Sequence, residues 1–272
     1  IASDLDVTFK RIGSLTVALE EHQLQILQDL EKRSKINGVD VQLLDAKQTK
    51  ELEPCLSDDV KGSLFAPTAG IINPFTLTVH ALENAINNGV KLSLGEEVIN
   101  IIQNDNYFDV ITNKKTYQTK IIINCAGLFG DKIHSLIEPI DYSINPRKGE
   151  YFVLAQLPYN FVNHTIFPLP SSKGKGVLVS PTTSNNFLVG PSSEWVNDKD
   201  DLSTDKPTLD NVKSQAKLMV KNIPFDQCIR TFAGLRATPS THDFIIGFAK
   251  NNNHFINAIG IESPGLASSP AI

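Results

Sequence analysis

Several residue types and motifs are scarce or missing in this chain of 272 residues. Its three cysteines, Cys55, Cys125 and Cys228, form neither a metal-type pair nor an even disulfide framework, which favours a reducing, cytoplasmic location. No apolar run approaches the roughly 18 residues needed to span a bilayer. The H-E-x-x-H and G-x-S-x-G motifs are absent, and the histidines have no metal-ligand spacing. We therefore expect neither a metal site nor the nucleophile elbow of the α/β-hydrolases.

The charge and the ends of the chain narrow the options further. The net charge is −5 and no long basic tract is present, which argues against a nucleic-acid partner. Hydrophobic residues make up 41% and charged residues 20%, the balance of a globular protein. Residue 1 is Ile, the single methionine is Met219, and the chain stops just as a helix begins. From this we expect an internal fragment.

Three helices have local start signals. Residues 20–35 carry leucines at helical spacing and end at Asn37-Gly38, a frequent helix stop. Asp45 is followed three positions later by Gln48, the pattern of a capping box. Asn73-Pro74 offers a cap and a first-turn proline to a helix that should end at Gly89.

The strand signals divide the chain into two kinds of segment, which alternate along the sequence: α/β segments and segments of short strands. The expected strands are residues 14–19, 90–94, 98–103, 107–112, 121–123, 150–155, 177–180, 187–190, 227–230 and 254–258. The run 121–123 is all isoleucine, which suits a strand buried on both faces of a parallel sheet. From Pro139 the texture changes to short strands and one helix, residues 207–221, which predicts an antiparallel sheet flanked by a helix. After about residue 230 the α/β texture returns.

Two glycine turns are candidates for ligand binding. Ala126-Gly127 follows the isoleucine strand, and glycine lets backbone approach a ligand at the carboxyl end of a sheet. A tight turn without a ligand explains that segment equally well. Gly260 and Pro264-Gly265 precede a helix start, whose backbone amides suit an electron-rich or anionic group.

Basic side chains offer weaker candidates. Arg236 follows a strand and a glycine, where it would clamp a carboxylate or phosphate, or else pair with a neighbour such as Asp243. Arg147-Lys148 either faces an anionic substrate or is a solvated pair. Residues 171–176 look like a phosphate loop, but a strand follows where a helix is needed, so a hairpin tip is favoured.

Taken in order, seven segments resemble one family, the FAD-dependent oxidoreductases of the D-amino-acid oxidase and glycerol-3-phosphate dehydrogenase superfamily. Within it the chain resembles the branch of the anaerobic-type glycerol-3-phosphate dehydrogenases and their 2-hydroxyglutarate oxidase relatives. The segments are residues 9–15 (FKRIGSL), 66–74 (APTAGIINP), 123–127 (INCAG), 148–151 (KGEY), 232–236 (FAGLR), 243–247 (DFIIG) and 260–266 (GIESPGL). They span nearly the whole chain.

The resemblance implies a fold and shows that one motif of that fold is missing from this sequence. The fold is α/β plus α+β, with an incomplete Rossmann-like FAD-binding domain interleaved with an antiparallel-sheet substrate domain. Substrate-domain segments would be 1–69 and 138–232, and FAD-binding segments 70–137 and 233–272. The G-x-G-x-x-G turn that holds the pyrophosphate in such enzymes is not in this sequence. We therefore expect residues 1–272 alone to be deficient in FAD binding and inactive.

The resemblance also implies site residues. Val98 would touch the adenine side of FAD, and Ala126 and Gly127 would lie near the adenosine and phosphates. The residues expected to approach the isoalloxazine ring are Gly260, Ile261, Pro264, Gly265 and Leu266. Arg236 would clamp a small anionic substrate, with Lys148 and Tyr151 as weaker substrate contacts.

The reaction implied is hydride transfer from a substrate C–H bond to the flavin. Glycerol 3-phosphate is the first substrate to consider, and a 2-hydroxyacid such as 2-hydroxyglutarate, or an amino acid, is the alternative. The catalytic base stays unidentified, His242 being the histidine nearest to Arg236 in sequence. The electron acceptor is also open, and the resemblance is compatible with a complete enzyme bound peripherally to a membrane. The alternative outside the enzymes is that the chain is a non-catalytic, sheet-rich binding module.

Overall fold

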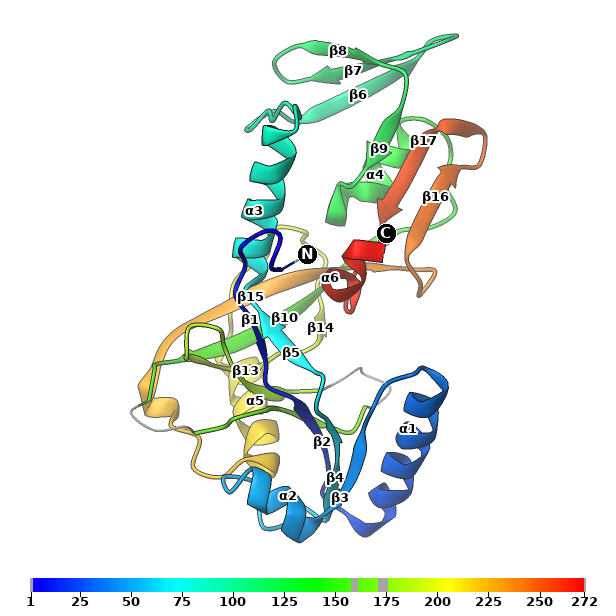
Figure 1. The fold of residues 1–272 in the computed structure, drawn as a ribbon. Coiled ribbons are helices and arrows are strands. Elements are labelled where there is room, and N and C mark those ends of the chain that lie inside the picture. Colours follow the sequence, from blue (N-terminus) through cyan, green and yellow to red (C-terminus); the bar gives the residue numbers. More distant parts are fainter. Residues whose placement is uncertain (1, 158–160, 171–175, 272) are drawn as a thin grey trace. The chain divides into compact units, whose positions relative to one another are not determined.

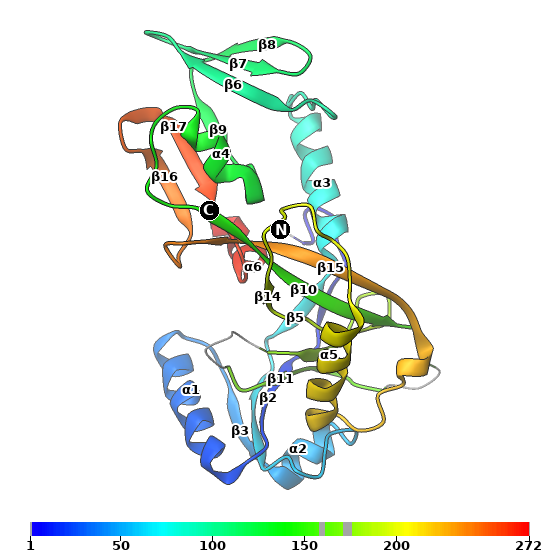
Figure 2. The same ribbon diagram turned by 180° about the vertical axis from the view of Figure 1, so that it is seen from behind.

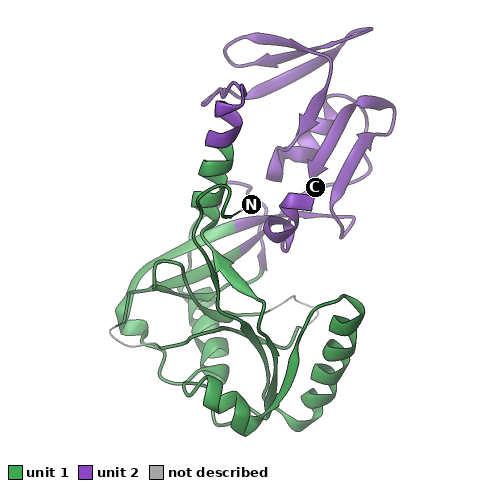
Figure 3. Cartoon of the chain, viewed as in Figure 1, with its two compact units in different colours: residues 1–82, 149–193, 202–234 green, residues 83–148, 194–201, 235–272 purple. Residues whose placement is uncertain are grey.

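The computed structural model describes residues 2–157, 161–170 and 176–271, which form a mixed α/β fold with several sheets (Figure 1). The chain divides into two compact units (Figure 3). Unit 1 comprises residues 1–82, 149–193 and 202–234, and unit 2 comprises residues 83–148, 194–201 and 235–272. The units thus alternate along the chain. Their boundaries lie after residues 82, 148 and 234, where the sequence suggested 69, 137 and 232, and the excursion 194–201 was not anticipated.

Most of a nine-stranded sheet belongs to unit 1. Its strands are β2 (Ser14–Ala18), β3 (Gln42–Asp45), β4 (Gly62–Ala66), β10 (Ile144–Leu154), β11 (Thr165–Pro168), β12 (Leu178–Pro181), β13 (Phe187–Gly190), β14 (Glu194–Trp195) and β15 (Cys228–Pro239). Strand β14 and parts of the long strands β10 and β15 belong to unit 2. The order is β14-β10-β13-β12-β11-β2-β4-β3, with β15 on β10. The pairs β10–β13, β10–β14, β11–β12, β12–β13, β2–β4 and β3–β4 are antiparallel as expected, whereas β11 runs parallel to β2.

The core of unit 1 lies between this sheet and helix α5 (Lys206–Met219), which is best seen in Figure 2. Alternate strand residues point to the helix, as the two-residue period of a strand requires. The fully buried members include Leu15, Val17, Ile166, Val179 and Val189 of the strands and Val212, Ala216 and Met219 of the helix. Burial of each large aliphatic side chain contributes about 1.5–3 kcal/mol, so this layer dominates the stability of unit 1.

Of the next three helices, the second and third begin where the sequence indicated, whereas the first begins four residues later than the expected start at residue 20. After a 3-10 turn (η1, Glu21–Gln23), α1 covers Leu24–Ile36. Helix α2 (Ala46–Leu52) starts with the predicted capping box, in which Asp45 and Gln48 exchange hydrogen bonds at 2.8 and 3.0 Å. The Asn73 side chain accepts from the first amides of α3 (Pro74–Asn87), also as predicted. A small sheet of β1 (Phe9–Arg11) and β5 (Gly70–Ile72) and a 3-10 turn (η3, Phe225–Gln227) complete the unit.

Unit 2 holds two three-stranded sheets and short helices. The elements are β6 (Val98–Gln103), β7 (Phe108–Thr112), β8 (Thr116–Thr119), β9 (Ile122–Asn124), η2 (Gly127–Phe129), α4 (Gly130–Ser135), β16 (Ile245–Ala249), β17 (Asn252–Ile259), α6 (Gly265–Ser268) and η4 (Ser269–Ala271). Strands β6, β7 and β8 form an antiparallel meander, as predicted for the hairpin. In the other sheet β17 lies between β16 and β9, antiparallel to the first and parallel to the second. Phe255 and Phe108 are buried where these sheets meet α4.

Two expectations for unit 2 were wrong. Residues 90–94 form no strand, and Val90 and Leu94 are 53% and 74% exposed. Their apolar spacing finds no neighbouring strand to pair with in the described part of the chain. Ile121 and Ile123 are 55% and 62% exposed, so the isoleucine run is not buried on both faces. The reason is that β9 ends its sheet with β17 as its neighbour, and burial depends on neighbours that a local pattern does not reveal.

Candidate functional site

The turn after β9 is shaped by the side chain of Asn124. Its Oδ1 accepts a hydrogen bond from the backbone N–H of Ala126 at 3.2 Å, and its Nδ2 donates to the carbonyl of Gly130 at 2.9 Å. Gly127 has a φ of +53°, a left-handed conformation that favours glycine, and a Cβ placed there would meet no atom within 4 Å. The turn therefore exposes backbone to open space on its outer side.

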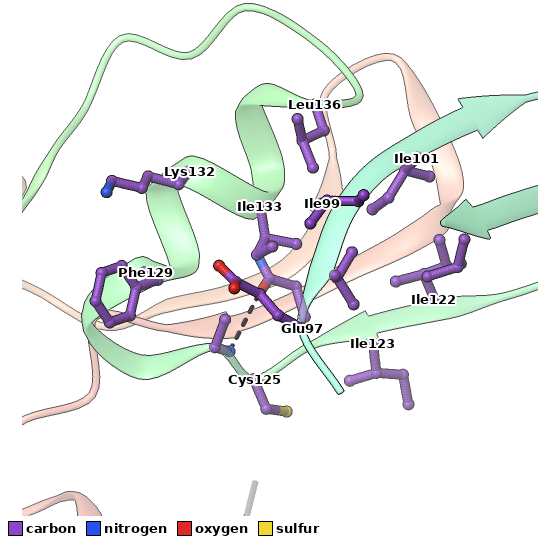
Figure 4. Close-up of a pocket in the computed structure, with 14 residues that line it drawn as sticks. Glu97, Ile99, Ile101, Ile122, Ile123, Cys125, Phe129, Lys132, Ile133 and Leu136 are labelled. Carbon is purple, nitrogen blue, oxygen red and sulfur yellow. Dashed lines mark hydrogen bonds between the residues drawn. The ribbon is translucent and has the colours of Figure 1, made fainter. Parts of the chain in front are cut away.

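A pocket of about 600 Å³ lies beside this turn within unit 2 (Figure 4). Its walls come from β6, β9 and α4, with isoleucine side chains over much of the surface and the Asn124–Ala126 hydrogen bond, dashed in Figure 4, at one end. Val98 and Ala126 are among the lining residues, together with Cys125. An apolar pocket of this size with a few polar groups at its edge is suited to a flat organic ligand.

A second pocket, of about 360 Å³, adjoins the first because Cys125 lines both. The other lining residues are Gly127, Ala258, Ile259, Ile261, Gly265 and Ser269. The turn after β9 and the turn after β17 are far apart in sequence, yet residues of both turns line the second pocket. The turn after β17, residues 260–266, is called the closing turn below. Its members Gly260, Pro264 and Leu266 do not line these two pockets.

Backbone packing explains the glycines of the closing turn. Gly260 has a φ of +63°, and a Cβ there would stand 2.9 Å from the ring of Pro239. A Cβ on Gly265 would stand 2.2 Å from Cγ2 of Ile261, which real side chains do not tolerate. Both positions therefore require glycine whether or not a ligand is bound, since each allows the chain to double back tightly.

Glu262 ties the closing turn to two strands. Its Oε2 accepts from Nη2 of Arg147 on β10 at 2.6 Å and from the hydroxyl of Thr238 on β15 at 2.8 Å. Both partners of the ion pair are 21% exposed, so the pair is shielded from solvent more than a typical surface pair. The Arg147 guanidinium also lies 5.7 Å from the ring of Trp195.

Arg236 sits next to this ion pair. It lies within β15 rather than after it, and its Nη1 donates to the carbonyl of Arg147 at 3.4 Å, a long hydrogen bond. Arg236 is thus linked to the closing turn through Arg147 and Glu262, all within unit 2.

The other two predicted substrate contacts are in different surroundings. Lys148 is 6% exposed and forms an ion pair with Asp201 at 2.9 Å. Tyr151 belongs to unit 1, where its ring stacks on that of Phe232 with centroids 5.0 Å apart. His242 is exposed in the turn after β15, with a φ of +60°. Of the loop 171–176, residues 171–175 lie outside the described part of the chain.

Sequence reasoning missed a buried polar cluster behind the turn. Asn124, Asn257, His134 and Glu138 are each less than 9% exposed. One signal was present in the strand pattern, because Asn257 stands two residues from Phe255 and so shares its buried face. Burial works to raise the pKa of Glu138, but hydrogen bonds from the Asn251 and Lys250 amides and from His134 outweigh it and lower the pKa below its ordinary value.

Two absences hold for the described residues. They contain no group of three or more histidine, cysteine, aspartate or glutamate side chains placed to hold a metal ion. Nor does any of their helices combine the length and the apolar character needed to cross a membrane.

Comparisons with known proteins agree on the class of fold and cofactor. The sequence profile of the DAO family, described as FAD dependent oxidoreductase, matches residues 1–272. The chain is 42% identical over 273 residues to a glycerol 3-phosphate dehydrogenase of Caloramator mitchellensis, covering 100% of this chain and 57% of that protein. It is 34% identical over 272 residues to a glycerol 3-phosphate oxidase of Mycoplasma genitalium, covering 97% and 71% of the two chains.

A solved structure supports the same likeness. It is the dithionite-reduced L-α-glycerophosphate oxidase of Mycoplasma pneumoniae with FAD bound, which matches with a TM-score of 0.92 at 30% identity. The match covers 97% of this chain and 71% of that one. The expected fold class, a mixed α/β fold like those of FAD-dependent oxidases, is confirmed, and the resemblance noted in the sequence is confirmed with it.

Proposed function

The chain belongs to the DAO family of FAD-dependent oxidoreductases, and from that premise we propose that the protein oxidises glycerol 3-phosphate. The chain spans 57% of the length of the dehydrogenase it matches at 42% identity. The activity of the whole protein is therefore a proposal. One observation of the structure carries the proposal: the turns after β9 and β17 line two pockets that share Cys125. An elongated cofactor that contacts two distant segments of the chain would occupy neighbouring pockets of this kind.

The residues fit FAD in shape and chemistry. The larger pocket has apolar walls and includes Val98, which we assign to the adenine side. Ala126 lines the larger pocket and Gly127 the smaller one, and we assign the open space beside Gly127 to the adenosine and phosphate groups. The remaining assignments, to the isoalloxazine side, are Gly260, Ile261, Pro264, Gly265 and Leu266. Bound FAD would supply a hydride acceptor.

The substrate side rests chiefly on Arg236. A guanidinium binds phosphate through parallel N–H donors, and such charge-assisted bonds are stronger than neutral ones. Its link to the closing turn through Arg147 and Glu262 ties the anion-binding group to the segment that we assign to the flavin. Lys148 and Tyr151 are assigned as secondary contacts. Because Lys148 is buried against Asp201, its main effect is to hold β10 in place.

The chain's own residues would then bind and orient a small anionic substrate and keep water from it. Removing a hydride from a carbinol carbon also requires a base for the hydroxyl proton. We assign no residue to that role, because His242 is exposed in the turn after β15. The electron acceptor and any peripheral attachment of the complete enzyme to a membrane are equally unassigned.

One spectrum tests the cofactor proposal. Because residues 1–272 contain no G-x-G-x-x-G turn, we expect the purified 272-residue chain to bind added FAD weakly or not at all. Stoichiometric retention of FAD by this chain would contradict that expectation. The whole natural protein should show flavin absorbance. If it stays colourless with excess FAD, the non-catalytic binding module is favoured instead.

A substrate screen tests the rest. The flavin absorbance of the whole natural protein should bleach under anaerobic conditions with glycerol 3-phosphate. Bleaching by 2-hydroxyglutarate or an amino acid, with none by glycerol 3-phosphate, would show that the proposed substrate is wrong. The proposed reaction class, hydride transfer to the flavin, would still hold.

A further inference from the structure

A chain of buried polar side chains lies behind the cofactor turn and is not explained by cofactor or substrate contact. It runs from Asn124 on β9 to Asn257 on β17, then to His134 on α4 and Glu138 after it. Nδ2 of Asn124 donates to Oδ1 of Asn257 at 3.0 Å, and Nδ2 of Asn257 lies 3.3 Å from Nδ1 of His134. Nε2 of His134 lies 3.2 Å from Oε1 of Glu138. Burying four such groups costs free energy unless each is paired.

Backbone groups fix the direction of the hydrogen bonds at the Asn124 end. The amide of Ala126 can only donate and the carbonyl of Gly130 can only accept, so Oδ1 of Asn124 must face the first and Nδ2 the second. Asn124 therefore donates to Asn257, which must present its oxygen. The Nδ2 of Asn257 is then directed at His134, and Nδ1 of His134 must accept.

The other end is compatible with this direction. Glu138 accepts from the backbone amides of Lys250 at 2.7 Å and Asn251 at 2.9 Å, so it is an acceptor toward His134 as well. Nε2 of His134 therefore donates to Glu138, and Nδ1 remains the acceptor that Asn257 requires. The two ends agree, and every donor along the chain meets an acceptor.

A second donor shares Nδ1 of His134. The hydroxyl of Tyr142 lies 2.5 Å from that atom, closer than Nδ2 of Asn257. Burial, with the nearby charges of Asp131, Glu138 and Asp141, raises the pKa of Tyr142 to about 12, so its hydroxyl keeps its proton and donates. Tyr142 thus touches the same atom of His134 without belonging to the path toward Asn124.

We propose that Asn257 is a positioning residue, which passes the orientation fixed by His134 and Glu138 to Asn124 and so holds the Ala126–Gly127 turn in its cofactor-binding shape. That the turn binds FAD rests on the proposed function. The hydrogen-bond path from Glu138 to Asn124 is observed and does not depend on that function. Neither Asn257 nor His134 lines the two pockets, so both act through Asn124.

The test compares Asn257→Leu with Tyr142→Phe. Each substitution removes one donor to Nδ1 of His134 with little change of shape, but the first also removes the contact with Asn124. We measure hydrogen exchange of the Ala126 amide in the protein without FAD. Loss of one net hydrogen bond predicts exchange about 3- to 10-fold faster in Asn257→Leu. Exchange in Tyr142→Phe should stay within about twofold of the wild type, although its melting temperature falls as well.

Faster exchange to the same extent in both variants, or in neither, overturns the proposal, because a merely structural role predicts no difference between them. If Asn257→Leu does not fold, the smaller substitution Asn257→Ala replaces it. That variant also removes the contacts with Asn124 and His134, so wild-type exchange at Ala126 would again overturn the proposal.

The affinity for FAD, measured on the whole natural protein by flavin fluorescence, gives a second readout. The dissociation constant should rise about 3- to 10-fold in Asn257→Leu and stay within about twofold in Tyr142→Phe. An unchanged constant in Asn257→Leu overturns the link to FAD. If the wild-type protein does not bind FAD, the proposed function fails, while exchange at Ala126 still decides the positioning role.

Discussion

Replacement of Arg236 by alanine should separate anionic from neutral substrates. The side chain lies beside the Arg147–Glu262 pair, which anchors the closing turn at 2.6 Å. Hydrogen bonds to charged groups contribute about 1.5–3 kcal/mol each, which corresponds to a factor of roughly 12 to 150 in affinity. If Arg236 binds the phosphate of glycerol 3-phosphate, Arg236→Ala should raise KM for that substrate by about this factor.

The assay is steady-state oxidation of glycerol 3-phosphate and of glycerol by the FAD-loaded natural protein. For glycerol, which has no phosphate, KM should change by less than about threefold, since the variant loses no contact with it. Arg236→Lys should restore part of the loss, because it keeps the charge but not the paired donors of a guanidinium.

Arg230→Ala is a matched control on the same strand. Arg230 is exposed, so its removal lowers the net charge equally without altering the Arg147–Glu262 pair. It should leave both KM values nearly unchanged. Equal changes in KM for glycerol 3-phosphate and glycerol in Arg236→Ala would refute the role assigned to Arg236. Equal changes in both alanine variants would mean that Arg236 acts only through its long-range charge.

Three further predictions concern a helix cap in unit 1 and the cysteine thiols. Asp205→Ala removes the side chain that accepts from the Thr208 amide at 2.9 Å at the start of α5, so the free energy of unfolding should fall by about 0.5–2 kcal/mol in urea denaturation. Asp210→Ala, on the exposed face of the same helix, should cost less, and an equal cost would contradict the capping role. Burial and the charge of Glu53 raise the pKa of Cys55 to about 12, so at pH 8 iodoacetamide should modify the exposed Cys125 well before Cys55, as mass spectrometry of the peptides would show. Because the folded-state pKa of this thiol is raised, its contribution to stability is present below about pH 9 and is lost as the pH rises toward 12, and stability that increases over that range would contradict the reasoning.

Local signals in the sequence were reliable because the contacts that enforce them are local. Asp45 and Gln48 are three residues apart and form the expected capping box, and Asn73 caps the helix that begins at the next residue. A cap needs only its own first turn, so tertiary structure rarely overrides it.

Features that depend on distant partners were not accessible in the same way. The isoleucine run before Asn124 has the composition of a buried strand, but its burial depends on which strands lie beside it. The partners of Glu262 lie 115 and 24 residues away, and Asn257 is 133 residues from Asn124. Spacing along the chain does not reveal such pairs. The alternation around Asn257 indicated that its side chain faces inward, but not which group it meets there.

We propose that the turn after β9 and the turn after β17 bind the same FAD molecule. A crystal structure of the natural protein with FAD bound tests this proposal. We expect flavin nucleotide atoms in contact with Ala126 and Gly127, and ring atoms in contact with Gly265 and its neighbours. FAD bound elsewhere, with both turns facing only solvent, would contradict it.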